Sequence, residues 1–310
     1  MALHPQAQQL LDLLAQVGFA DMATLTPAEA RAQMDAFPRP EGDPVAGVAD
    51  RTVPGPAGDI PVRVYTPEGA GRKPVVVFFH GGGWVIGSLD SHDATCRAVC
   101  NAAGAVVVSV DYRMAPEHKF PAAPDDCFAV TKWVAENAAS IGADGARIAV
   151  AGDSAGGNLA AAVTLMARER GGPEIGFQAL IYPVTDYSFG TPSYAENGEG
   201  YMLTKGAMEW FWGHYASVAD AANPLASPLR EKDLSGLPRA LVITAGYDPL
   251  RDEGETYAKR LADAGVPVAS TRYDGMIHGF FGNAALDDST TAVNQVGAAI
   301  REAFALEPAR

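Results

Sequence analysis

Residues 149–158 read Ala-Val-Ala-Gly-Asp-Ser-Ala-Gly-Gly-Asn, and they connect an expected strand to an expected helix. The strand (147–151) is short and apolar, and the helix (155–170) is rich in Ala and Leu. Between them lies the pattern Gly-x-Ser-x-Gly, in which Gly152 and Gly156 let strand and helix approach closely. The turn places Ser154 at a helix N-terminus, where backbone N–H groups favour developing negative charge. The stretch therefore predicts that Ser154 is a nucleophile, provided that the chain supplies a base, an acid and an oxyanion hole.

An ordinary glycine-rich turn could carry the same pentapeptide, so the surrounding sequence has to decide. Strand and helix patterns alternate along most of the chain, which predicts an α/β protein with a mainly parallel sheet covered by helices on both faces. The short turn 55–59 predicts an antiparallel hairpin at the start. The expected strands are 48–53, 60–65, 75–79, 105–110, 147–151, 177–182, 240–244 and 268–273. The expected helices are 6–18, one that begins at Pro27, 125–139, 155–170, 252–264 and 291–304.

The interval between the strands 177–182 and 240–244 is too long for a simple loop and is rich in aromatic residues, among them Trp210, Phe211 and Trp212. We expect a helical insertion there, which packs with the N-terminal helices as a cap. The predicted division is 1–45 for the N-terminal cap helices, 46–186 and 226–310 for the catalytic domain, and 187–225 for the cap insertion.

Composition narrows the function. The chain has 310 residues with 37 acidic and 23 basic side chains, a net charge of −14, which argues against nucleic-acid or basic membrane-surface binding. Three cysteines, Cys96, Cys100 and Cys127, are too few for a disulfide framework, and buried free thiols are the better interpretation than a metal site. The first residues lack a basic segment and no apolar run reaches membrane-spanning length, so we expect a cytoplasmic protein without stable membrane association.

Polar groups that follow strands are the candidates for the site, because ligands bind beyond the carboxyl ends of parallel strands. His80-Gly-Gly-Gly-Trp84 follows the buried strand 75–79, and its glycines can expose backbone N–H groups as an oxyanion hole requires. His278 follows the last strand, where the order Ser…Asp…His places the base. Asp248 and Asp186 both follow strands and are rival acids, whereas Asp252 and Glu253 are better placed to charge the start of the next helix.

Five motifs occur in order: His80-Gly-Gly-Gly-Trp84, Asp111-Tyr-Arg-Met-Ala-Pro-Glu-His118, Gly152-Asp-Ser-Ala-Gly-Gly157, Asp248-Pro-Leu-Arg-Asp-Glu253 and Ile277-His-Gly-Phe280. Together they resemble the hormone-sensitive lipase-like esterase family (bacterial family IV type carboxylesterases) of the α/β-hydrolase fold. The resemblance implies an eight-stranded, mostly parallel sheet with a helical cap. It selects Asp248 over Asp186 as the acid, and Gly82, Gly83 and Ala155 as the oxyanion donors.

The predicted function is that of a serine carboxylesterase, which uses Ser154, His278 and Asp248 on short- to medium-chain acyl esters without cofactor or metal. Trp84, Asp153, Tyr182 and Phe211 are candidates for substrate contact, although packing explains the aromatic ones equally well and Asp153 is better explained by local bonding. Tyr112, Arg113 and Glu117 are expected to brace the glycine loop. Amide or formamide hydrolysis and, less favoured, a non-catalytic small-molecule receptor remain open. The expected partner is a small ester, and a homodimer is possible.

Overall fold

The computed structural model describes residues 2–37, 39 and 41–305. Within them, eight strands form one sheet in the order β1-β2-β4-β3-β5-β6-β7-β8. Only the pairs β1–β2 and β2–β4 of this described sheet are antiparallel, so the predicted fold class is confirmed. The strands are β1 (Gly47–Gly55), β2 (Gly58–Thr66), β3 (Lys73–Phe79), β4 (Val106–Val110), β5 (Ala143–Asp153), β6 (Phe177–Ile181), β7 (Arg239–Tyr247) and β8 (Val268–Ile277).

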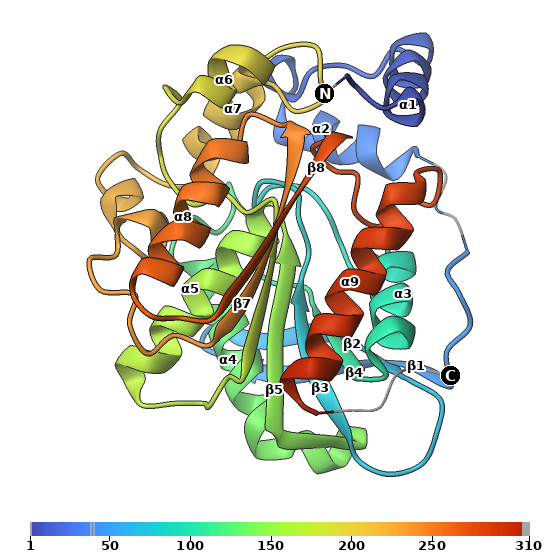
Figure 1. The fold of residues 1–310 in the computed structure, drawn as a ribbon, viewed down its shortest axis with the longest axis vertical. Helices are drawn as coiled ribbons and strands as arrows, with labels where there is room; N and C mark the ends of the chain where they lie inside the picture. Colours follow the sequence, from blue (N-terminus) through green and yellow to red (C-terminus); the bar gives the residue numbers. More distant parts are fainter. Residues whose placement is uncertain (1, 38, 40, 306–310) are drawn as a thin grey trace.

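The central strands are apolar on both faces because helices cover both. In β3, Val75, Val77 and Phe79 point into one core cluster, and Val76 and Phe78 point into another, as the alternation of side chains along a strand requires. The first cluster includes residues of α4 (Ala122–Asn137) and α5 (Ala155–Arg170), and the second includes residues of α3 (Asp93–Ala103) and α9 (Asp287–Ala303). Figure 1 shows α3 and α9 on one side of the sheet and α4 and α5 on the other.

Four further helices gather at the end of the sheet where β5 and β7 finish (Figure 1). They are α1 (Pro5–Gln16), α2 (Pro27–Asp35), α6 (Pro192–Asn197) and α7 (Lys205–Tyr215), and α8 (Arg251–Asp263) follows β7. Helix α2 begins with a capping box, in which Thr26 and Glu29 exchange side-chain bonds with each other's backbone N–H groups. Helix α7 packs against the short 3₁₀ helix η1 (Met22–Thr24), and Thr204 Oγ1 donates to Asp21 Oδ2 at 2.8 Å.

The two ends of the insertion after β6 lie close together, because both contact the buried side chain of Asn158. Its Nδ2 donates to the carbonyls of Val184 at 3.0 Å and Ala226 at 2.8 Å. Because Asn158 lies on α5 just after the Gly-x-Ser-x-Gly turn, the helix that begins at this turn also anchors both ends of the insertion. None of the helices in the described part of the chain is long and apolar enough to cross a membrane.

Candidate active site

Ser154 lies on a strained turn between β5 and α5. Its φ of 56° and ψ of −119° are outside the regions that L-residues favour. The turn requires glycine on both sides, because a Cβ atom at Gly156 would lie 1.9 Å from the carbonyl oxygen of Phe79, and one at Gly152 would lie 2.4 Å from the carbonyl carbon of Gly156. The Ser154 N–H donates to the carbonyl of Ile181 at 2.8 Å. The close approach of β5, β3 and α5 therefore fixes the backbone that carries the hydroxyl.

His278 and Asp248 meet Ser154 from two other strand ends. His278 directly follows β8 and Asp248 directly follows β7. His278 Nε2 lies 2.9 Å from Ser154 Oγ, and His278 Nδ1 lies 2.8 Å from Asp248 Oδ2. The fully buried Asp248 accepts at Oδ1 from the Leu250 N–H at 2.8 Å. A carboxylate at Nδ1 fixes the tautomer that leaves Nε2 free to accept the serine proton, so the geometry suits a nucleophile, base and acid.

The other carboxylates considered for the acid are held elsewhere. Asp186 forms an ion pair with Arg230 at 2.5 Å, and Asp252 accepts from the Ser193 N–H at 2.8 Å. Glu253 Oε1 accepts from the N–H groups of Thr185 and Asp186 at 2.7 and 3.2 Å. Burial, against which these two bonds act, raises the pKa of Glu253 well above its ordinary value. Glu253 therefore holds the start of the insertion, a role that its position in the sequence did not reveal.

The glycine loop after β3 faces the turn at Ser154. Gly82 and Gly83 have φ values of 110° and 57°, and the Gly82 carbonyl accepts from the N–H groups of Val85 and Ile86 at 3.1 and 3.0 Å. A side chain at Gly82 would overlap the carbonyl of Ile86. Ala155 is the first residue of α5, so its N–H belongs to the helix-terminal group that lacks an intrahelical acceptor. The role of Gly82, Gly83 and Ala155 as oxyanion donors stays a prediction.

Polar contacts brace this loop, and one of them comes from the N-terminal helix α2. Arg31 donates to the carbonyls of Val85 and Ala115 at 2.9 Å each and to both carboxylate oxygens of Glu117 at 2.7 Å. Sequence reasoning missed Arg31, because nothing in α2 indicates a partner so far along the chain. Two of the three expected bracing residues contact the loop or its brace: Tyr112 donates to the His80 carbonyl at 2.8 Å, and Glu117 accepts from Arg31. The third, Arg113, pairs instead with Asp126 on α4.

Comparison with known families identifies the group to which this structure belongs. A family model described as the alpha/beta hydrolase fold matches residues 76–282. The chain belongs to this family. As an α/β hydrolase it carries its nucleophile, acid and base candidates after β5, β7 and β8, the chain order that the motifs predicted.

Several named relatives cover most of this α/β hydrolase. It is 46% identical over 282 residues to the carboxylic ester hydrolase LipN of Mycobacterium tuberculosis, a match that covers 88% of this chain and 74% of that one. It is 36% identical over 312 residues to an arylesterase of Saccharolobus solfataricus, covering 98% and 100% of the two chains. The crystal structure of a thermostable esterase from Pseudomonas putida superposes with a TM-score of 0.94 at 41% identity, covering 99% of each chain. The esterase family predicted from the motifs is confirmed.

The four candidates for substrate contact lie in different environments. Trp84 is fully buried and stacks on Tyr215 of α7, with ring centroids 4.0 Å apart. Phe211, also on α7, rests against Gly83, where a Cβ atom would lie 2.2 Å from the ring. Tyr182 is buried with its ring centroid 4.5 Å from that of His278. Asp153 Oδ1 accepts from the Gly81 N–H of the glycine loop at 3.0 Å. Contact of these residues with substrate stays a prediction.

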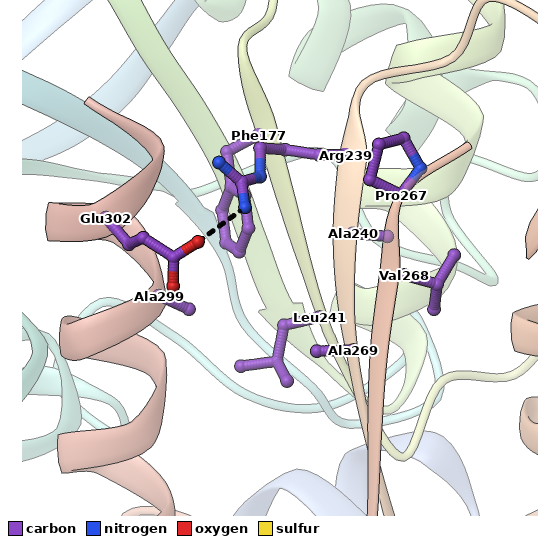
Figure 2. Close-up of a pocket in the computed structure, with 9 residues that line it drawn as sticks. All are labelled: Phe177, Arg239, Ala240, Leu241, Pro267, Val268, Ala269, Ala299 and Glu302. Carbon is purple, nitrogen blue, oxygen red and sulfur yellow. Dashed lines mark hydrogen bonds and ion pairs between the residues drawn. The ribbon is translucent and has the colours of Figure 1, made fainter. Parts of the chain in front are cut away.

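A separate pocket of about 190 Å³ lies where β6, β7 and β8 begin (Figure 2). Its lining includes Phe177, Arg239 and Val268, the first residues of β6, β7 and β8. Arg239 and Glu302 of α9, which also lines the pocket, form an ion pair with a nitrogen–oxygen distance of 2.8 Å. The candidate triad residues follow the opposite ends of strands in the same sheet, so this pocket is not part of the candidate active site. In residues 2–37, 39 and 41–305, no three His, Cys, Asp or Glu side chains group as they would around a metal ion.

Proposed function

We propose that this chain is a serine carboxylesterase that hydrolyses short- to medium-chain acyl esters through Ser154, His278 and Asp248. The enzyme class, carboxylic ester hydrolase, follows from relatives that are named carboxylic ester hydrolase or carboxylesterase and that match most of this chain. The observation that carries the mechanism is the unbroken hydrogen-bonded chain from Ser154 Oγ through both ring nitrogens of His278 to Asp248, set opposite a glycine loop.

In the first half of the reaction, His278 Nε2 takes the Ser154 proton while Ser154 Oγ attacks the ester carbonyl carbon. The carbonyl oxygen becomes an oxyanion, to which the N–H groups of Gly82, Gly83 and Ala155 donate. The tetrahedral intermediate collapses, His278 gives its proton to the departing alkoxide, and an alcohol leaves. Ser154 is then acylated.

In the second half, water replaces the alcohol. His278 takes a proton from water as its oxygen attacks the acyl carbon, the same N–H groups hold the second oxyanion, and His278 returns the proton to Ser154 Oγ as the carboxylic acid leaves. Asp248 fixes the His278 ring and stabilises the imidazolium in both halves. Because Asp248 is fully buried, water does not compete for its bond to Nδ1.

The helices α1 and α2 and residues 187–225 would form the cap over this site. Their contacts support this division, because α7 packs on η1 and Arg31 of α2 reaches the glycine loop. A cap that lies directly on the loop through Phe211 leaves limited space, which suits small acyl groups. We also propose that the protein resides in the cytoplasm, which cell fractionation tests. We further propose that it forms a homodimer, which light scattering tests.

The test is the rate of hydrolysis of aryl esters from acetyl to longer acyl chains. Ser154→Ala should lower kcat at least about 100-fold without lowering the melting temperature, while Ser140→Ala, on an exposed position of η2 (Ala138–Ile141), should match the wild type. If Ser154→Ala keeps most of its activity, the mechanism is wrong. Faster hydrolysis of a matched amide or formamide would favour the amidase alternative, and no turnover of either would favour the receptor.

A further inference from the structure

Helix α6 of the insertion is hydrogen-bonded to the loop that carries the proposed acid. We call residues 248–250, between β7 and α8, the acid loop. Ser193 is fully buried in the first turn of α6, and its hydroxyl donates to the Pro249 carbonyl at 2.6 Å. The hydroxyl of Thr191 lies 3.0 Å from the same Ser193 oxygen and carries its own hydrogen. The Ser193 hydrogen is therefore free for the carbonyl, which can only accept.

One peptide group links Ser193 to the carboxylate of Asp248. The Pro249 carbonyl and the Leu250 N–H belong to the same planar unit, because a single peptide bond joins these two residues. The N–H donates to Asp248 Oδ1 at 2.8 Å, and Asp248 Oδ2 lies 2.8 Å from His278 Nδ1. Since the unit is planar, holding its oxygen also sets the direction of its N–H. A hydroxyl of the insertion therefore acts on the carboxylate through one peptide group.

Further contacts fix α6 on the acid loop. The helices α6 and α8 cap each other, because Asp252 Oδ2 accepts from the Ser193 N–H at 2.8 Å and the Asp252 N–H donates to Ser193 Oγ at 3.3 Å. N–H groups in the first turn of a helix have no acceptor within it, so both bonds satisfy donors that would otherwise be unpaired. Asn197 Nδ2, at the other end of α6, lies 3.3 and 3.4 Å from the carbonyl oxygens of Gly246 and Asp248.

We infer that Ser193 is a positioning residue for ester hydrolysis, which orients the Leu250 N–H and through it the Asp248 carboxylate toward His278. The inference rests on the function proposed above, because it concerns the acid of that mechanism. In serine hydrolases, disabling the acid of the triad lowers kcat by about 10⁴-fold, and a small misplacement of a catalytic group loses part of its effect. The insertion thus contributes to the chemistry and does not only cover the site.

The first test is Ser193→Ala, which removes the hydroxyl. We expect kcat on an aryl acetate to fall about tenfold, with KM within about twofold, because Ser193 acts on the acid and not on substrate binding. If Ser193→Ala does not fold, Ser193→Cys, which fills the same space and bonds only weakly, should show the same fall.

The matched control is Ser227→Ala, at the far end of the insertion. Ser227 is also fully buried, and its hydroxyl also donates to a carbonyl, that of Ala221 at 2.7 Å, and accepts from an N–H, that of Tyr187 at 3.1 Å. Ser227→Ala should lower the melting temperature about as much as Ser193→Ala but should keep kcat within about twofold.

Two measurements separate positioning from stability. In an Asp248→Asn background, which has no carboxylate to orient, adding Ser193→Ala should change kcat by less than about twofold. In proton NMR, the low-field resonance of the proton between His278 and Asp248 should move to higher field in Ser193→Ala and stay in place in Ser227→Ala, because a displaced carboxylate lengthens that bond. A full kcat, an unmoved resonance, or an equal fall in both backgrounds overturns the inference. Activity retained by Ser154→Ala would instead refute the proposed function.

Discussion

Replacing Asn158 with alanine should loosen both ends of the insertion at once. The buried Asn158 amide donates to the carbonyls of Val184 and Ala226 at 3.0 and 2.8 Å. Each such bond contributes about 1 kcal/mol net, and each buried carbonyl left without a donor costs about 1–3 kcal/mol. We therefore expect the free energy of unfolding to fall by about 2–6 kcal/mol, which corresponds to a melting temperature lower by about 4–12 °C for a chain of this size.

The assay is thermal unfolding followed by circular dichroism, together with amide hydrogen exchange. Exchange should rise at the amides of residues 184–187 and of residues 226, 227, 229 and 230 more than in β3, because the lost bonds tie these two segments to α5. Asn137→Ala is the control, since its side chain is only half-buried and donates to one carbonyl, that of Trp133 in its own helix, at 3.0 Å. It should cost about 1 kcal/mol or less. If Asn158→Ala unfolds at the same temperature as the control, the bonds do not anchor the insertion.

Two further predictions concern the turn and the glycine loop. Gly156→Ala should prevent folding or lower the melting temperature by more than about 10 °C, because its Cβ atom would overlap the Phe79 carbonyl. The control is Gly213→Ala, which has open space around its helical position and should be neutral or stabilising. Equal solubility and equal melting temperatures of the two variants would count against the turn geometry. The bond from Arg31 lowers the pKa of Glu117 to about 2, so the stabilisation by this pair is present above the ordinary glutamate pKa near ~4.3 and is lost as the pH falls toward 2. Glu117→Gln should therefore melt about 1–2 °C below the wild type at pH 7, a difference that shrinks between pH 5 and pH 3, and a constant difference would show that the charge is not responsible.

The sequence predicted the elements well where apolar patterning is strong. All eight expected strands occur, because runs such as 75–79 and 106–110 are buried on both faces and carry a continuous apolar signal. Boundaries were less accurate where the residues are polar. Helix α9 begins at Asp287 rather than at Thr291, since its first turn, Asp-Asp-Ser-Thr, has no apolar periodicity. The strand order could not be read from the sequence, because pairing between distant strands leaves no local pattern.

Within the site, the sequence predicted groups that follow strands and missed those that act over long distances. Ser154, Asp248 and His278 come directly after strands, so their meeting at one edge of the sheet could be expected. Arg31 and His92 contact the site across the fold, and nothing in their own segments points to Val85 or Asp153. Trp84 shows a further limit: an aromatic residue in a catalytic motif can serve either packing or recognition, and the structure stacks it on Tyr215.

The anchoring of both insertion ends by one asparagine has a consequence for how such an enzyme can change. In the described part of the chain, the hydrogen bonds of this side chain go to the backbone carbonyls of residues 184 and 226, and carbonyls are the same in every amino acid. A different segment between them can therefore keep the anchor on α5. The insertion also contacts the rest of the site, because Phe211 rests against Gly83 and Tyr215 stacks on Trp84. Grafting residues 187–225 from a relative is thus a route to altered selectivity where the graft preserves these contacts.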